Sequence, residues 1–254
     1  MTFFSPAPPR VLAHRGLALE APENTLLAFA KALALGVTHL ETDVHGSSDG
    51  VAMVSHDPDL TRLVGRKVQV GDLTAGELRK IRLGADQGYC SLAEALDGFP
   101  DARFNIDIKV DSAIVPTIAT IRDLRAVERV LIGSFSAKRR LAVVRELPGV
   151  ATSVSAQGAI AAVAAARAPG GHAAVRRILR DVDAVQLPLS ILGMSTMTPR
   201  TIAAFHAADI EVHAWTINRE TEMDRLLDLG VDGLVTDRSD LAMTVLKRRE
   251  TASS

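Results

Sequence analysis

Short apolar runs alternate with amphipathic, helix-like segments along almost the whole chain. The runs that we expect to be strands lie at residues 11–13, 40–44, 104–110, 130–132, 150–154, 184–187, 211–217 and 233–236. The first helix is expected to open with Asn24 as its N-cap and to stop at Gly36. About eight strand–helix units in 254 residues predict an α/β fold, a (β/α)8 TIM barrel that forms one domain over residues 1–254. The alternative, an open doubly wound sheet, lacks a G-x-G-x-x-G motif after the first strand.

One segment breaks this alternation between the second and third expected strands. It contains an Asp49-Gly50 turn and two short helix-like stretches, 74–82 and 91–96, each opened by a Thr or Ser cap. We interpret it as a small insertion after the second strand, at about residues 57–103. In a barrel, this position lies over the C-terminal mouth, where active sites form.

Two histidines and a carboxylate pair lie close together in the first quarter of the chain. His14 follows the first expected strand, Glu41 and Asp43 lie on the second, and His56 comes shortly after it. Side chains two residues apart on a strand point to the same side, so Glu41 and Asp43 can hold one ion together. Histidines beside such a pair are typical of metal-assisted acid–base chemistry, with His14 and His56 as the candidate catalytic residues.

The third expected strand supplies further polar side chains on one face. Asn105, Asp107 and Lys109 alternate along it, so Asp107 is a candidate third metal ligand and Lys109 a candidate phosphate contact. A site built from carboxylate oxygens favours Mg²⁺ or Ca²⁺ over Zn²⁺. We therefore expect one divalent cation, Mg²⁺ or Ca²⁺ with Mn²⁺ as a further possibility, bound by Glu41, Asp43 and Asp107.

Three further residues are candidates for contact with a substrate. Arg15 offers a planar guanidinium suited to phosphate oxygens, and the adjacent Gly16 allows the backbone to approach a ligand closely. Glu23 stands at the expected mouth. Trp215, at a strand end, either packs in the core or walls a ligand pocket.

The remaining polar residues receive a structural interpretation or none. Asp237, at the end of the last expected strand, is read as a helix cap. His45 and His213 are expected near the mouth without an assigned role, and three histidines are read as structural, namely His39, His172 and His206.

Composition and charge exclude several classes of function. A net charge of -1 provides no overall basic field for nucleic acid or an anionic membrane surface. No apolar run reaches the length of a membrane span, so we expect no stable membrane insertion. Without a recognisable secretory signal, and with Cys90 as its single cysteine, the protein is expected to be cytoplasmic. The sequence does not indicate its oligomeric state.

Taken together, the motifs resemble the glycerophosphodiester phosphodiesterase family. The matching segments occur in the family's order and span nearly the whole chain: HRG (14–16), PENT (22–25), ETDVHGSSDG (41–50), VSHDPDLTR (54–62), NIDIK (105–109), WTIN (215–218) and GVDGLVTD (230–237). The resemblance implies a TIM barrel with a small insertion after the second strand. It also implies His14 and His56 as the catalytic pair, and a substrate side lined by Trp215.

The activity implied by this resemblance is metal-dependent hydrolysis of glycerophosphodiesters to glycerol 3-phosphate and an alcohol through a cyclic phosphate. In this scheme His14 is the base and His56 the acid. Asp107 departs from the family, which more often has Glu there; aspartate reaches roughly 1.5 Å less. An aspartate at this place is also similar to spider-venom-type phospholipases D, which are secreted and disulfide-bonded. The alternatives are a lysophospholipase D on the same barrel and a non-catalytic phosphodiester-binding barrel.

Overall fold

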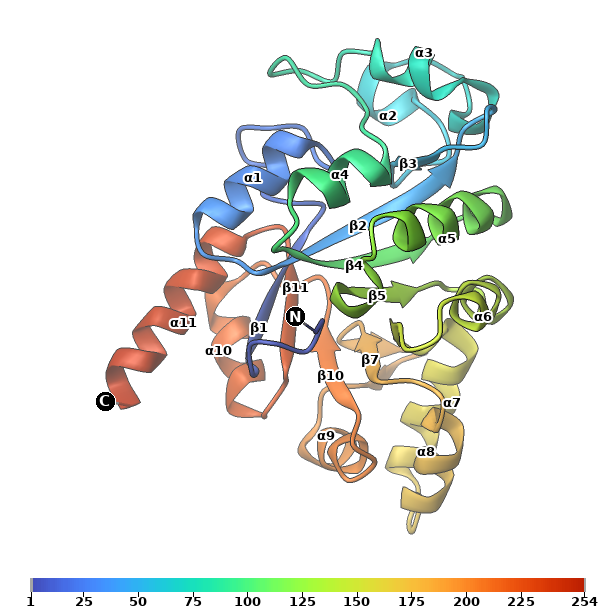
Figure 1. Ribbon diagram of the computed structural model, residues 1–254. Helices are drawn as coiled ribbons and strands as arrows, with labels where there is room; N and C mark the ends of the chain where they lie inside the picture. The colour runs from blue at the N-terminus through green and yellow to red at the C-terminus, as the bar shows by residue number, and fades with distance from the viewer. Residues whose placement is uncertain (1, 254) are drawn as a thin grey trace.

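Parallel strands form a barrel in the computed structural model, which describes residues 2–253 (Figure 1). Around the barrel the strands follow one another in the order β6-β5-β4-β2-β1-β11-β10-β7, and a parallel bridge between Ser153 and Ala184 joins the two ends. Their bounds are β1 (Arg10–His14), β2 (His39–Gly46), β4 (Arg103–Ile108), β5 (Val130–Gly133), β6 (Ala151–Thr152), β7 (Ala184–Leu187), β10 (Glu211–Ala214) and β11 (Gly233–Thr236). The predicted (β/α)8 barrel is thereby confirmed.

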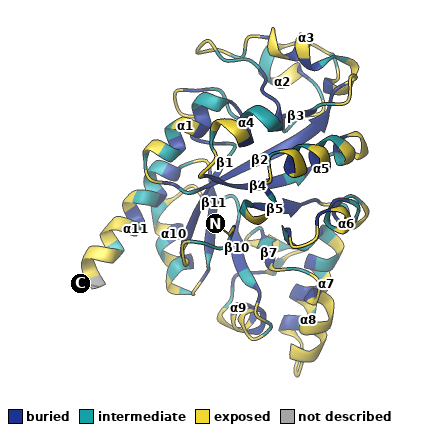
Figure 2. Cartoon of the chain, in the orientation of Figure 1, coloured by how far each residue is buried: buried dark blue, intermediate teal, exposed yellow. Residues whose placement is uncertain are grey.

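Helices cover the outside of this barrel, and their buried residues face inward (Figure 2). Phe29 of α1, for example, is fully buried and meets Phe104 of β4 edge-on, with ring centroids 5.8 Å apart. The helices are α1 (Leu26–Ala34), α4 (Leu92–Gly98), α5 (Ile114–Asp123), α6 (Ala137–Glu146), α7 (Ala156–Arg167), α8 (His172–Leu179), α9 (Pro199–His206), α10 (Glu220–Asp228) and α11 (Ser239–Ser253). Within residues 2–253, no helix has the length and apolar composition needed to cross a membrane.

The chain between β2 and α4 forms a small lobe beside the mouth of the barrel. It contains β3 (Ala52–Val54), α2 (Thr61–Val64), the 3-10 turn η1 (Val70–Asp72) and α3 (Ala75–Arg79). β3 pairs antiparallel with the C-terminal end of β2, so the lobe starts at the mouth. The lobe has an apolar core of its own, built around Met53, Leu60, Val70, Leu78 and Tyr89. α4 packs beside α5 in the outer layer.

Three short segments complete the fold. The 3-10 turns η2 (Asp111–Ala113) and η3 (Val127–Arg129) lie on either side of α5. A small antiparallel hairpin, β8 (Ser190–Ile191) and β9 (Met194–Ser195), follows β7.

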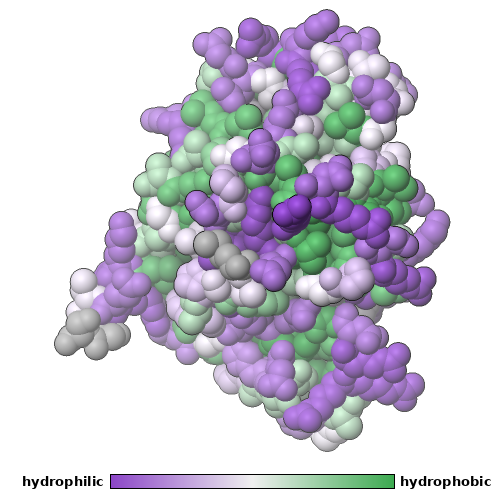
Figure 3. All heavy atoms as spheres, viewed as in Figure 1, coloured by the Kyte–Doolittle hydropathy of each residue, from purple (hydrophilic) through white to green (hydrophobic). Residues whose placement is uncertain are grey.

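The N-terminal segment closes the other end of the barrel. Phe3 is buried there, and its carbonyl accepts a hydrogen bond from Nε2 of His39 at 2.7 Å. Figure 1 shows this end with the N-terminus near its centre, and Figure 3 shows a surface of mixed polarity around it.

His213 lies inside this closed half of the barrel, so its expected position near the mouth was wrong. The residue is fully buried, pairs in register with Gly233 at the start of β11, and contacts Glu211 with Nε2 at 3.1 Å. A Cβ atom on Gly233 would come within 2.7 Å of the His213 ring, so glycine makes room for the imidazole.

Candidate active site

A pocket of about 400 Å³ opens at the C-terminal ends of the strands, opposite the end that the N-terminal segment closes. Eight of the nine candidate site residues line it: His14, Arg15, Glu41, Asp43, His56, Asp107, Lys109 and Trp215. The ninth, Glu23, lies behind Arg15, whose Nη1 donates to Glu23 Oε1 at 3.0 Å. The barrel therefore brings together side chains that are far apart in the sequence.

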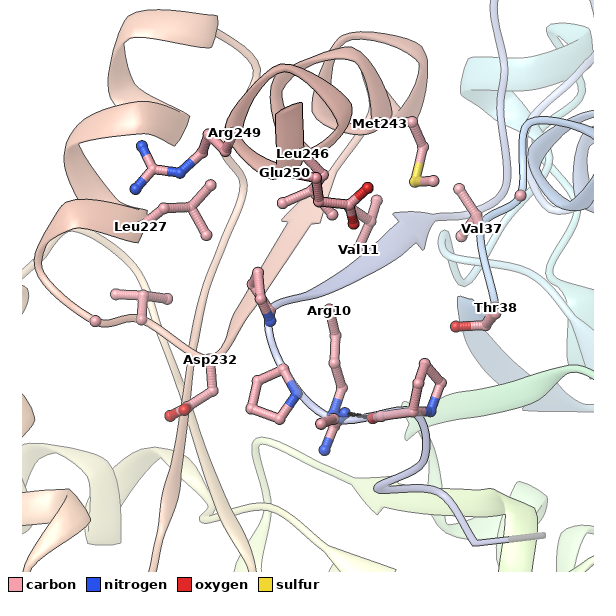
Figure 4. A pocket seen from close by; sticks show the side chains of 17 residues that line it. Arg10, Val11, Val37, Thr38, Leu227, Asp232, Met243, Leu246, Arg249 and Glu250 are labelled. Carbon is pink, nitrogen blue, oxygen red and sulfur yellow. Dashed lines mark hydrogen bonds between the residues drawn. The ribbon is translucent and has the colours of Figure 1, made fainter. Parts of the chain in front are cut away.

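A larger hollow of about 690 Å³ lies at the closed end, between the proline-rich residues 6–9 and helices α10 and α11. Its lining, shown in Figure 4, combines apolar side chains such as Val37, Met243 and Leu246 with a few charged ones. Its lining contains neither a histidine pair nor a carboxylate cluster, so the candidate residues for acid–base chemistry are those of the pocket at the mouth.

His14 is oriented by a carboxylate from the other end of the chain. Its Nδ1 donates to Oδ1 of Asp237 at 2.6 Å, and its Nε2 lies 3.9 Å from Oε2 of Glu41. Burial disfavours the imidazolium, but Glu41 and the hydrogen bond to Asp237 outweigh it and raise the pKa of His14. His14 therefore keeps Nε2 for proton transfer and holds its proton more firmly than a free histidine does.

Asp237 is a candidate site residue that the sequence analysis missed, because it was read as a helix cap. Asn218 fixes it, accepting from the Asp237 backbone N–H at 2.9 Å and donating to Oδ2 at 2.7 Å. Strand order provides the signal that could have found it. β11 lies beside β1 in the closed barrel, so the residue after β11 stands next to His14 at the end of β1.

His56 is held by a similar arrangement on the lobe. Its Nδ1 donates to Oδ1 of Asp57 at 2.8 Å, and Oδ2 of Asp57 accepts from Nε of Arg62 at 2.5 Å. Arg62 also binds Glu23, which in turn accepts from Arg15. Although burial opposes it, these contacts with His56 and Arg62 lower the pKa of Asp57. A continuous chain of ion pairs thus joins the lobe to the end of β1.

The three candidate metal ligands lie at the ends of two neighbouring strands. Asp43 on β2 and Asp107 on β4 stand side by side in register, and Glu41 lies two residues before Asp43. The ammonium of Lys109 sits between the two aspartates, 2.7 Å from Oδ1 of Asp43 and 2.8 Å from Oδ2 of Asp107. Burial and the nearby Asp43 carboxylate raise the pKa of Glu41.

The donor set suits a hard divalent cation. Oδ1 of Asp107 and Oδ1 of Asn105, two residues earlier on β4, are buried without a hydrogen-bond partner, and burial disfavours the charged form of Glu41. Among residues 2–253, no three His, Cys, Asp or Glu side chains are already arranged to hold a metal ion, and the Lys109 ammonium stands between Asp43 and Asp107. A cation that used all three carboxylates would therefore require Lys109 to move toward the pocket.

The prediction that Asn24 caps the first helix is wrong. Asn24 instead contacts the carboxylate cluster. The N-cap is Thr25, whose hydroxyl accepts from the Ala28 N–H at 3.3 Å. Asn24 adopts a left-handed conformation (φ 56°) and donates to Oδ2 of Asp43 at 3.3 Å, while Thr42 donates to its Oδ1 at 2.8 Å. Asn24 therefore orients one of the candidate ligands.

Gly16 is required for packing of the loop after β1, whether or not the backbone there also approaches a ligand. It has a positive φ of 81°, and a Cβ atom there would meet the backbone of Ala28 at 2.6 Å. Glycine thus lets the loop after β1 lie directly against α1, which positions the preceding Arg15.

One wall of the pocket is apolar. It is formed by Phe135, Val154, Ile160, Pro188, Ile191 and Trp215. The rings of Phe135 and Trp215 meet edge-on with centroids 6.1 Å apart, and Nζ of Lys109 lies 5.9 Å from the centre of the Phe135 ring. Phe135 therefore lies where the apolar wall meets the charged cluster. Of the two places expected for Trp215, the core or a pocket wall, the structure shows the pocket wall.

Comparisons with known proteins find similar chains among phosphodiesterases and phospholipases. The chain is 44% identical over 239 residues to a Mycobacterium tuberculosis protein named probable glycerophosphodiester phosphodiesterase 2, covering 94% of this chain and 90% of that one. It is 27% identical to lysophospholipase D GDPD1 of Mus musculus, covering 90% and 83% of the two chains.

The fold has close structural neighbours. A crystal structure of a putative glycerophosphoryl diester phosphodiesterase from Silicibacter pomeroyi superposes with a TM-score of 0.79 at 24% identity, covering 96% of this chain and 95% of that one. The model of the Glycerophosphoryl diester phosphodiesterase family matches residues 14–241, from the first catalytic candidate into the last helix. With this match and a 44% identical relative, the chain belongs to the glycerophosphoryl diester phosphodiesterase family.

Proposed function

We propose that this protein hydrolyses glycerophosphodiesters to glycerol 3-phosphate and an alcohol by acid–base catalysis between His14 and His56. The observation that carries the proposal is that both histidines line one pocket and each is fixed at Nδ1 by a carboxylate, from Asp237 and Asp57 respectively. Each imidazole therefore keeps Nε2 for proton transfer, as a general acid or base requires. Membership of the family and the 44% identical relative support the same activity.

The two histidines would divide the proton transfers between them. In the first half, His14 takes the proton from the glycerol 2-hydroxyl as its oxygen attacks phosphorus, and His56 gives a proton to the departing alcohol oxygen. The bond between phosphorus and that oxygen breaks, which leaves a five-membered cyclic phosphate. In the second half, water adds to phosphorus with the histidine roles exchanged, and the ring opens to glycerol 3-phosphate.

Two cationic side chains would neutralise the phosphate. Arg15 lines the pocket beside His14, and Lys109 lies at its floor between Asp43 and Asp107. Charge that builds on the phosphate oxygens during attack is stabilised by such fixed cations. Burial opposes it, but Asp43 and Asp107 raise the pKa of Lys109, so the ammonium remains charged.

One divalent cation, Mg²⁺, Ca²⁺ or Mn²⁺, would be held by Glu41, Asp43 and Asp107. When bound, such an ion supplies Lewis-acid polarisation of a phosphate or hydroxyl oxygen. The unpaired buried oxygen of Asp107 and the raised pKa of Glu41 support this role for the carboxylates.

Release of glycerol 3-phosphate from glycerophosphocholine tests the proposal. Protein stripped of metal should be inactive and should recover with one or more of the three ions, whereas Glu41→Gln should not. A diester whose glycerol lacks the 2-hydroxyl should remain intact. Its hydrolysis would instead favour direct attack by water. Folded protein that releases nothing with any ion would support a barrel that only binds phosphodiesters.

Lysophospholipids are a second candidate class of substrate, favoured by the apolar wall around Phe135 and Ile160. A 1-acyl lysophospholipid also has a free 2-hydroxyl, so the same chemistry applies to it. Comparing kcat/KM for glycerophosphocholine and lysophosphatidylcholine separates the two classes. If the acyl chain uses this wall, Ile160→Ser should lower kcat/KM only for the lysophospholipid, by about tenfold for one lost apolar side chain.

A further inference from the structure

We propose that the rim of the pocket around the β8–β9 hairpin is a docking surface for anionic phospholipid bilayers. We call this the rim surface: the apolar side chains of Phe135, Leu189 and Leu192, with Arg167 and Arg200 beside them. The inference goes beyond the proposed activity and does not depend on which phosphodiester is cleaved.

Leu192 at the tip of the hairpin is the most informative residue of the rim surface. Its exposed fraction is 79%, so burial does not account for a leucine there. It also has a positive φ of 50° and is followed by Gly193 at 76°, the turn conformation in which Asn and Gly are favoured and a branched apolar side chain is costly. Neither the core nor the turn therefore explains this leucine, whereas contact with an apolar phase does.

The tip is continuous with the apolar wall of the pocket. Pro188 and Ile191, on either side of the exposed Leu189, both line the pocket, and so does Phe135, which is 59% exposed. Of the six large apolar residues exposed among those described, half belong to the rim surface. A patch of this kind beside a binding pocket marks an interaction site.

The charge around the rim surface complements an anionic partner. Residues 134–206 contain nine Lys and Arg against three Asp and Glu, although the whole chain has a net charge of -1. This stretch, which includes the rim surface, therefore carries an excess of positive charge, although Arg140 is buried and Lys138 and Arg139 pair with Asp111. Arg167 and Arg200 are exposed; they donate to the carbonyls of Ser195 and Ala168, and neither forms an ion pair with a described carboxylate.

A lipid surface suits this combination better than the other polyanions or partners. Single-stranded nucleic acid is bound by several aromatic side chains that stack with bases, and the rim surface offers one, Phe135. A second copy of the chain would bring together two surfaces of the same positive sign. Apolar side chains at a tip with arginines behind them match the depth profile of a membrane interface, with acyl chains below anionic headgroups.

Flotation with phospholipid vesicles tests the docking surface without any turnover. The wild-type protein should float with vesicles that contain phosphatidylglycerol and remain largely free with phosphatidylcholine alone. Leu192→Asn should lower the partition coefficient about three- to tenfold. Arg167→Gln with Arg200→Gln should lower it about fivefold for each charge, and high salt should have the same effect.

Matched controls keep this result specific. Val115 on α5 is similarly exposed, at 73%, and Val and Asn have comparable helix propensity, so Val115→Asn should leave vesicle binding unchanged. Leu192→Asn should melt no lower than the wild type because Asn suits a positive φ.

The docking surface would be overturned if the wild type did not float, or if Val115→Asn and Leu192→Asn lost vesicle binding equally. Sedimentation that showed a dimer broken by Leu192→Asn would assign the surface to a second copy instead. None of these outcomes bears on hydrolysis of a soluble diester.

Discussion

Asp237 accepts a hydrogen bond from Nδ1 of His14 at 2.6 Å, across 223 positions of sequence. The contact exists because the first and last strands of the barrel are neighbours. A carboxylate at Nδ1 fixes the tautomer of the imidazole, so that Nε2 is the atom that exchanges a proton with the substrate.

Asp237→Asn should therefore impair catalysis while leaving the fold intact. The amide no longer favours the imidazolium, so we expect kcat to fall by about 10²-fold. The pKa of His14, which Glu41 and Asp237 raise against burial, should fall, and the limb of the pH profile due to His14 should move to lower pH. The profile of kcat/KM against pH measures both effects. Asp240→Asn, which removes the ion-pair partner of Arg238 at the start of α11, is the control and should change neither.

Removal of the Glu41 charge should have opposite effects on stability without and with metal. Burial and Asp43 raise the pKa of Glu41 above 4.5, so the folded protein binds this proton more tightly than the unfolded chain, and stability falls as pH rises above 4.5. Without metal at neutral pH, Glu41→Gln should thus melt higher than the wild type, by roughly 2–4 °C per kcal/mol relieved.

Addition of a divalent cation should reverse that order. The wild type should gain stability as the ion binds the folded state, and the gain should grow with pH because the ion competes with the proton of Glu41. Glu41→Gln should gain little. Calorimetric melting with and without Mg²⁺ or Ca²⁺ checks this, and an equal gain in both proteins would place the ion away from Glu41.

The barrel could be predicted from the sequence because apolar strands and amphipathic helices leave a periodic pattern at every unit. One unit is less regular than its pattern predicts: of the expected strand at 150–154, only Ala151–Thr152 forms a strand. The hydrogen-bond partners of residues near the strand ends were harder to predict from the sequence. Asn24 has the residue type of an N-cap, but the adjacent Thr25 takes that place, and nothing local to the sequence decides between them.

The direction of side chains limited the prediction of the site. Alternation placed Asp107 and Lys109 on one face, and both do line the pocket. It could not show that Lys109 would lie between Asp43 and Asp107, because this depends on the register of β2 with β4. The contact between Asp237 and His14 likewise follows from barrel closure and from no local motif.

Arg62 should matter for turnover more than for stability. It binds Asp57, the partner of His56, and Glu23, the partner of Arg15. Arg62→Ala should lower kcat about tenfold by loosening the orientation of His56. Because the side chain is 47% exposed, the free energy of unfolding should change by less than about 1 kcal/mol. Steady-state kinetics and urea unfolding measure the two effects. Arg66→Ala, on the same lobe, should change neither, and a similar kcat for both variants would remove Arg62 from the positioning of His56.

His39, which lies at the closed end of the barrel, should make the protein less stable in acid. Burial, partly offset by the hydrogen bond to the Phe3 carbonyl, lowers the pKa of His39 from 6.5 to about 4. The unfolded chain therefore binds more protons between these values, and the stability that neutral His39 provides is complete above pH 6.5 and lost as pH falls toward 4. This loss amounts to about 3 kcal/mol. Urea unfolding at a series of pH values should show it as a steep slope in the wild type.

In His39→Gln the same slope should be shallower, because glutamine keeps a donor for the Phe3 carbonyl and does not titrate. The variant starts from lower stability at neutral pH, so the informative quantity is the change with pH and not the absolute value. His172→Gln, at an exposed histidine on α8, should retain the wild-type slope. If His39→Gln also retained the wild-type slope, the acid sensitivity would arise from another group.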